Sequence, residues 1–76
     1  MKYISIVEVE QYNHPNPIKI TGIQCRICVN NHCHVELNVL ELSVKDKEYV
    51  VKRNDDSLEI LSPERFKQIY QLIEEN

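Results

Sequence analysis

The sequence predicts an α+β domain: an antiparallel β-meander of about five strands followed by one C-terminal helix packed on the sheet. Apolar and polar residues alternate through most of the chain before Ser62, and many of the apolar residues are β-branched. The last stretch, "SPERFKQIYQLIEEN", instead has helical spacing. No repeat or linker divides the 76 residues, so we expect a single small domain, 1–76.

The first strand is predicted over residues 2–10, "KYISIVEVE". The next stretch, "QYNHPNP", carries two prolines in three residues. A proline lacks a backbone donor and biases the residue before it away from helix, so this stretch predicts an extended surface loop.

A long central hairpin is predicted next, with strands over 18–29 and 33–44. A three-residue loop, Asn30–His32, places Val29 opposite Cys33 and gathers the apolar residues near the loop on one face. Asparagine tolerates the left-handed backbone that such a loop requires, so the turn chemistry agrees with this register.

The apolar positions of this hairpin change parity between Ile20 and Ile23 and again between Val39 and Leu40, and a similar change occurs in the first strand. Two interpretations follow. Paired bulges, one of them at Gly22, restore the phase, and a single apolar face packs under the helix. Alternatively, the base of the hairpin buries one face while its tip presents apolar surface on the other.

The rest of the meander is predicted from turn residues and pairing. A turn at Asp46 and Lys47 pairs the segments on either side of it in a further hairpin. A turn in "NDDS" then places Val51 opposite Ile60, in a short last strand over 57–61.

The helix is predicted over 62–75. Ser62 is a good N-cap, Pro63 fits the first helical position, and Glu64 favours the positive end of the helix dipole. An apolar stripe on one face indicates packing. Its members are Phe66, Ile69, Tyr70 and Ile73, with Leu72 beside them.

Every cysteine and two of the three histidines lie in "CRICVNNHCH", which begins at Cys25. In the predicted register, Cys25 and Cys33 face the apolar side and Cys28 and His34 the polar side, so the four side chains cannot share one ion. The easiest zinc donors are therefore Cys28, His32 and His34. The fourth ligand would come from a partner chain, or from Cys33 after a local rearrangement.

Several classes of function are disfavoured. The formal net charge is −3, which gives no basic field for direct nucleic-acid binding, and a single glycine rules out a glycine-rich phosphate loop. No apolar run is long enough to cross a membrane, and the start of the chain does not read as a signal peptide. Three cysteines cannot all pair within one chain, so we expect a reducing cytoplasm. A Cys28–His34 pair on an open sheet offers no cleft or oxyanion donors, so we expect no enzyme.

By elimination we expect a non-enzymatic protein-binding module, a homodimer that acts as an inhibitor or modulator of another macromolecule. Small acidic domains carried by phages and mobile elements include such proteins. The alternative is a small zinc-binding domain organised by the Cys/His cluster at 25–34, and no other cofactor is expected. The predicted partner interface combines apolar hairpin residues with an acidic turn. It consists of Ile23, Cys25, Ile27, Val29, Val35, Leu37, Asp55, Asp56 and Glu59.

Overall fold

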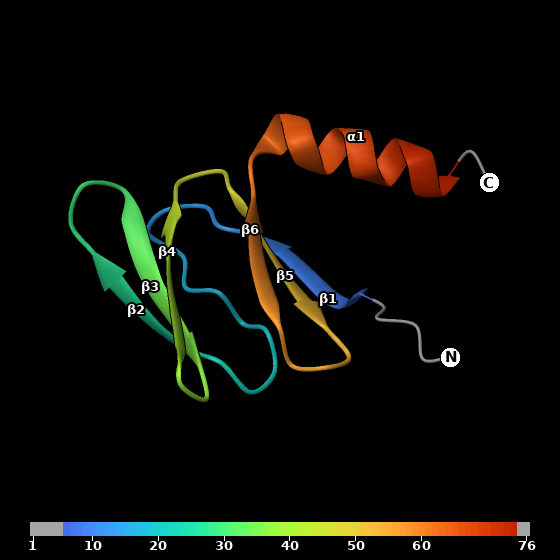
Figure 1. Ribbon diagram of the computed structural model, residues 1–76. Helices are drawn as coiled ribbons and strands as arrows, with labels where there is room; N and C mark the ends of the chain where they lie inside the picture. The colour runs from blue at the N-terminus through green and yellow to red at the C-terminus, as the bar shows by residue number, and fades with distance from the viewer. Residues whose placement is uncertain (1–5, 75–76) are drawn as a thin grey trace.

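The part of the chain that the structure describes forms two three-stranded antiparallel sheets and one C-terminal helix (Figure 1). The computed structural model describes the backbone of residues 6–74 and the side chains of residues 6–69. In chain order the elements are β1 (Ile6–Gln11), β2 (Gln24–Cys28), β3 (His32–Leu37), β4 (Leu40–Lys45), β5 (Tyr49–Arg53), β6 (Leu58–Leu61) and α1 (Pro63–Glu74). One sheet has the strand order β1-β5-β6 and the other β2-β3-β4. The α+β class and its antiparallel strands are confirmed, but the strands form two sheets.

The predicted long hairpin is wrong, because the chain reverses in the middle of its second strand. Leu37 pairs with Leu40 across a two-residue turn at Asn38 and Val39. Asn38 has a φ of 57°, a value that asparagine adopts more readily than most residues. The parity change at this point is therefore a turn between β3 and β4, which neither interpretation of the sequence foresaw.

The parity change before β2 is also a turn, at Thr21 and Gly22, where Gly22 has a φ of 85°. Residues 18–20 belong to no strand, yet Ile18 and Ile20 are buried. This part of the predicted hairpin is thus an irregular segment that contributes side chains to the core.

Side chains of the β1-β5-β6 sheet bind the backbone of this irregular segment. The N–H of Lys19 donates to Glu10 Oε1 (2.9 Å), and the N–H of Thr21 donates to the Glu8 carboxylate (3.1 and 3.3 Å). Lys52 Nζ donates to the carbonyl oxygen of Thr21 (2.6 Å). These contacts supply hydrogen bonds that a sheet ladder would otherwise give.

In the first strand the parity change is a bulge. β1 pairs with β5, and the register shifts between Ile6, which pairs with Arg53, and Glu8, which pairs with Lys52. The bulge interpretation therefore holds for this strand. Residues 2–5 of the predicted strand lie outside the described residues.

The predicted turn at Asp46 and Lys47 is confirmed, since the N–H of Glu48 donates to the carbonyl oxygen of Lys45 (3.1 Å) and Lys47 has a φ of 76°. The segments on either side do not pair as predicted. β4 pairs with β3, whereas β5 pairs with β1 and β6. This turn is therefore the crossing point between the two sheets.

The predicted pairing of the last two strands is wrong by one residue. Val51 pairs with Glu59, and Val50 pairs with Ile60. Val50 and Val51 are both completely buried although neighbouring strand residues face opposite sides. Val50 belongs to the main core cluster, and Ile60 packs against that cluster. The observed pairing therefore keeps both side chains on the core side of the sheet.

The core lies where the two sheets and the irregular segment meet. The proline-containing stretch contributes to the core through Tyr12, which is fully buried. After Tyr12 the chain makes a tight turn, closed by a bond from Asn16 N–H to the carbonyl oxygen of Asn13 (2.7 Å), and not the predicted extended loop. The buried cluster consists of Tyr12, Ile18, Ile20, Cys33, Val35, Val44 and Val50.

The helix begins as predicted. Ser62 Oγ accepts a hydrogen bond from the N–H of Arg65 (3.2 Å), which confirms the N-cap. Phe66 stacks on Tyr49, with ring centroids 3.9 Å apart and an interplanar angle of 9°. Beyond this contact α1 extends away from both sheets (Figure 1). Residues of both sheets instead share one buried cluster, so the sheets cover each other's apolar faces.

The stripe residues Tyr70, Leu72 and Ile73 have side chains outside the described set, as does residue 75 of the predicted helix. Among the described residues, no helix has the length and hydrophobicity that a membrane crossing requires.

Val35 provides a test of the core. Val35→Ala removes two buried methyl groups and leaves a cavity between the sheets, so we expect the free energy of unfolding to fall by about 2 kcal/mol. Val39→Ala makes the same change in a side chain that is fully exposed in the β3–β4 turn, and it should alter stability by less than about 0.5 kcal/mol. Urea denaturation of both variants measures the difference. Equal losses would contradict the placement of the core.

Candidate metal centre

The hairpin of β2 and β3 carries the Cys/His cluster. Its loop is Val29–Asn31, one residue earlier than the predicted Asn30–His32, because Cys28 pairs with His32. Asn30 and Asn31 both have positive φ, 63° and 60°, so the turn chemistry is as expected although its position is not.

The assignment of faces is correct despite this shift. Ile27 pairs with Cys33 and Cys25 with Val35, so these side chains still share the core side of the sheet. The shift also moves His32 out of the loop and into β3, where it faces outward beside His34.

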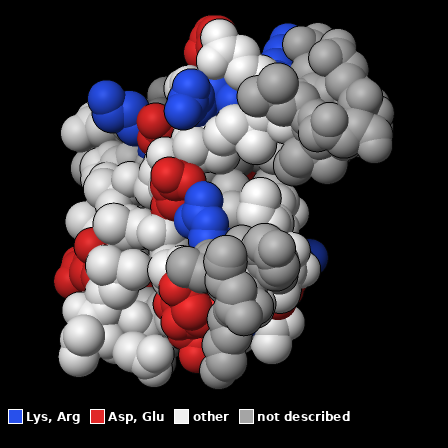
Figure 2. Space-filling model, turned by 45° about the vertical axis from the view of Figure 1, so that its right-hand side comes forward, with Lys and Arg blue, Asp and Glu red and all other residues white. Residues whose placement is uncertain are grey.

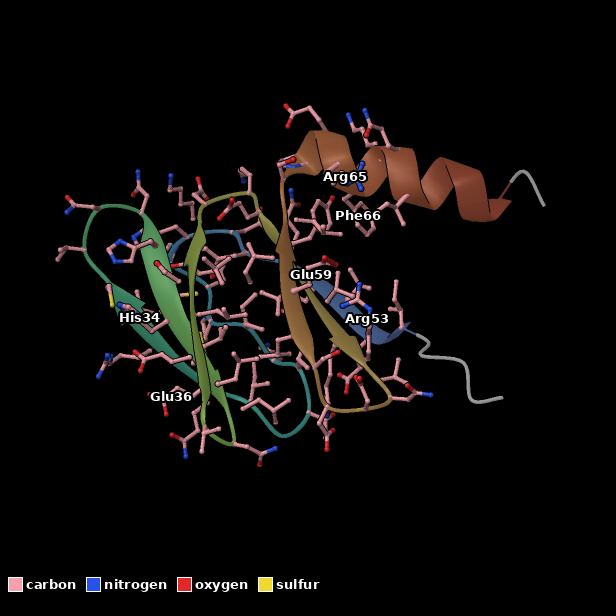
Figure 3. All side chains as sticks on the ribbon, viewed as in Figure 1. His34, Glu36, Arg53, Glu59, Arg65 and Phe66 are labelled. Carbon is pink, nitrogen blue, oxygen red and sulfur yellow. The ribbon has the colours of Figure 1, made fainter. Side chains whose placement is uncertain are left out.

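Cys28, His32 and His34 come together on the outer side of the hairpin. Among the described residues they form the group whose metal-binding atoms all lie within 4.8 Å of one another, and each side chain is half-buried. The two imidazole rings lie 5.7 Å apart at 74°. Figure 3 shows His34 projecting from the side of β3 away from the other sheet.

These distances are close to those of a bound metal. Donors about 2.0–2.3 Å from a tetrahedral zinc ion lie about 3.3–3.8 Å from one another. Direct cross-strand pairing places Cys28 beside His32, and His34 follows two residues later on the same face of β3.

A carboxylate borders the cluster on β4. Glu41 Oε1 lies 3.4 Å from His34 Nδ1 and 4.0 Å from Arg26 Nη2. A carboxylate at Nδ1 favours the tautomer with the proton on that nitrogen, which leaves Nε2 of His34 free to coordinate a metal. With a metal on Nε2 of His34, Glu41 would take the carboxylate position of the carboxylate–histidine–metal arrangement.

Cys33, which we included among the candidate ligands, does not belong to this group. It is completely buried on the core side, and burial, followed by the neighbouring Cys25, raises the pKa of its thiol to about 12. Its thiol therefore stays protonated, whereas a metal ligand must be a thiolate. Cys25 is half-buried beside it, and its Sγ accepts a hydrogen bond from Ile18 N–H (3.4 Å).

The predicted apolar interface is divided by the fold. Val35 and Leu37 are buried within the chain, and Ile23 and Cys25 are half-buried against the core. The second interpretation of the parity changes, a hairpin tip with all of this apolar surface uncovered, is therefore wrong. Ile27 is 37% exposed and Val29 77% exposed at the tip of the β2–β3 hairpin.

Hydrogen bonds within the β5–β6 turn occupy much of its acidic cluster. Asp55 accepts bonds from the hydroxyl (2.6 Å) and N–H (3.1 Å) of Ser57, and these bonds lower the pKa of its carboxyl group. Glu59 Oε1 lies 2.6 Å from Arg53 Nη2. Asp56 is exposed. Figure 2 shows acidic and basic side chains close together on the face that it presents, without a continuous basic patch.

Sequence reasoning missed the contribution of β4. Glu41, Ser43 and Lys45 lie beside the cluster only because the chain reverses at Asn38 and Val39. The available signal was the asparagine itself, placed between two apolar runs in "VELNVLEL".

The sequence matches no protein-family model, and no curated protein and no solved structure shows significant similarity to it.

The placement of the cysteines predicts their reactivity. In folded, reduced, metal-free protein at mildly alkaline pH, iodoacetamide should modify Cys28 first, because Cys25 packs against the core and Cys28 does not. Cys33 should be modified last, because it is buried and its thiol pKa is raised to about 12. Mass mapping of the modified peptides over time measures the order. Modification of all three at one rate in urea provides the control, and equally rapid modification of Cys33 in the folded protein would contradict its burial.

Proposed function

We propose that this protein is a zinc-binding β domain whose ligands are Cys28, His32 and His34. The observation that carries the proposal is the convergence of one sulfur and two imidazoles within 4.8 Å on the outer side of one hairpin. Thiolate and imidazole are the ligands that zinc prefers, and a soft thiolate disfavours magnesium and calcium.

Three protein donors leave one position of a tetrahedral ion open. Zinc sites that serve only structure have four protein ligands as a rule, whereas three-ligand sites keep a position for water, an added ligand or a partner's side chain. We therefore assign the centre a binding role beyond stabilising the hairpin.

Zinc binding should stabilise the folded chain. At a free zinc concentration one hundred times the Kd, the free energy of unfolding should rise by about 2.7 kcal/mol, since the unfolded chain does not hold the three donors together. His34→Ala should abolish this gain. Thermal unfolding with and without zinc, together with native mass spectrometry, measures it, and a chelator should reverse it.

Glu41→Gln and His14→Ala extend this test. Glu41→Gln should weaken zinc binding about tenfold while leaving one ion bound, because it removes the carboxylate beside His34 but none of the donors. His14→Ala is the matched control for His34→Ala, since His14 lies in another loop and contacts Tyr12. If His14→Ala reduced zinc binding as much as His34→Ala, the assignment would be wrong.

We propose as a second function that the hairpin tip binds protein, with a second copy of the chain as the first partner. β2 is an edge strand, and an edge strand can pair with another chain through its unpaired backbone groups. Ile27 and Val29 add exposed apolar surface at this edge. Action as an inhibitor or modulator of another macromolecule would use the same surface.

Val29→Lys tests this surface. A lysine at the tip would place a charge against the partner's apolar surface, so we expect sedimentation to show a dimer for the wild type and a monomer for the variant. Val39→Lys makes the same charge change in a fully exposed turn at the other end of β3, and it should leave the dimer intact. A monomeric wild type, with and without zinc, would refute the homodimer.

A further inference from the structure

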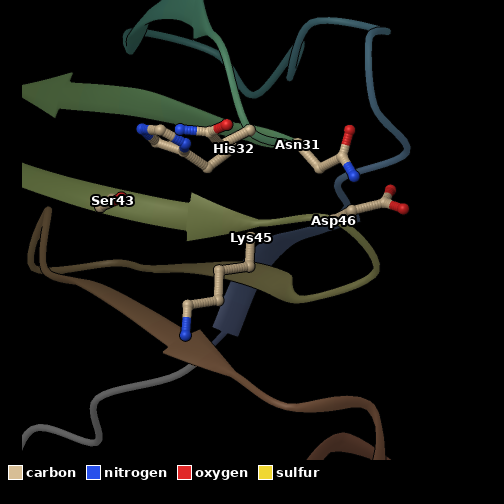
Figure 4. Close-up of a pocket in the computed structure, with 6 residues that line it drawn as sticks. Asn31, His32, Ser43, Lys45 and Asp46 are labelled. Carbon is tan, nitrogen blue, oxygen red and sulfur yellow. The ribbon is translucent and has the colours of Figure 1, made fainter.

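The outer face of β4 stands directly beside the proposed metal centre. Lys45 pairs with His32 and Ser43 pairs with His34, so both side chains emerge on the same face of the sheet as the donors. A hollow of about 530 Å³ lies at this end of the face (Figure 4). It is lined by Asn30, Asn31, His32, Ser43, Lys45 and Asp46.

The charges around this hollow favour an anion. A zinc ion bound by one thiolate and two neutral imidazoles carries a net charge of about +1, and Lys45 adds a second positive charge. Among the described residues, the Lys45 side chain takes part in none of the ion pairs. The lysine is therefore available to a ligand.

Two carboxylates oppose this positive charge: Glu41, which lies 3.4 Å from His34 Nδ1 outside the hollow, and Asp46, which lines the hollow. Asp46 Oδ1 accepts a hydrogen bond from the N–H of His14 (2.9 Å), and Figure 4 shows its carboxylate pointing away from His32. The Lys45 side chain also runs away from His32 in this view, but its backbone pairs directly with His32, and its flexible four-carbon stem can turn the ammonium group toward the metal.

We infer that the open metal position binds the oxygen of a small oxyanion, a phosphate or a carboxylate, which Lys45 and the Ser43 hydroxyl hold from the β4 side. This inference rests on the proposed zinc site and names the class of its ligand. A zinc ion held by Cys28, His32 and His34 would supply one bond to the anionic oxygen. A charge-assisted hydrogen bond from Lys45 and a neutral one from Ser43 supply orientation.

Cobalt in place of zinc makes the site visible. The full chain is loaded with Co²⁺, whose visible absorption reports thiolate ligation and coordination number, and is then titrated with inorganic phosphate and, separately, with acetate. We expect the cobalt bands to shift with saturation by at least one of the two anions, and the stronger binder identifies the oxyanion. Lys45→Ala should weaken that anion about tenfold and leave cobalt affinity unchanged.

Lys47→Ala is the matched control, because it removes the same charge two residues along the chain. The Lys47 side chain donates to Asn13 Oδ1 (2.8 Å) outside the hollow. Equal weakening in both lysine variants would overturn the role of Lys45. Cobalt bands that respond to neither anion would contradict oxyanion binding but not the metal site. The same holds if cobalt produces a dimer whose bands do not change with either anion. The absence of cobalt bands from the wild type would refute the metal site as well.

Discussion

The packing of one small sheet on the other, around Ile18 and Ile20, is the constraint on which the rest of the structure depends. A chain of this size buries only about 60% of its unfolded surface, and among the described residues no helix covers either three-stranded sheet along its length. An irregular segment supplies part of the missing apolar volume. Glu8, Glu10 and Lys52 bind the backbone of this segment, which lets it enter the space between the sheets without strand pairing.

This packing also determines which side chains remain for chemistry. Because Cys33 and Val35 must face the core, the alternation of the strand turns His32 and His34 outward. A slip of one residue would bury both histidines and expose the apolar set, so the register that the core requires is the register that assembles the donors. Zinc at the outer face would in turn favour this register, which couples metal binding to folding.

The sequence predicted the two faces of the β2–β3 hairpin, which depend on parity, and the start of the helix, which depends on local capping. The predicted faces of Cys28 and Cys33 are correct despite the error in loop position, because the pairing differs from the predicted one by two residues. The N-cap at Ser62 was predictable because it depends on local chemistry alone. The two-sheet arrangement was missed because Asn38 and Val39 form a tight turn without glycine. The predicted strand continued through Asn38 and Val39, which kept Glu41 and Lys45 away from His34 and His32. The residues around the site could therefore not be predicted without this turn.

The position of the proposed metal centre links the two proposed functions. The donors lie on β2 and β3, with the free edge of β2 on one side and the hollow beside β4 on the other. An ion joining Cys28 to His32 would fix the hairpin next to its loop and so reduce the entropy lost when the tip docks on a second copy. Linkage then requires that dimerisation strengthen zinc binding by the same factor by which zinc strengthens dimerisation. An oxyanion on the β4 side would take the open position of the metal without blocking the β2 edge. Zinc, a second copy of the chain and an oxyanion could therefore all be bound at the same time.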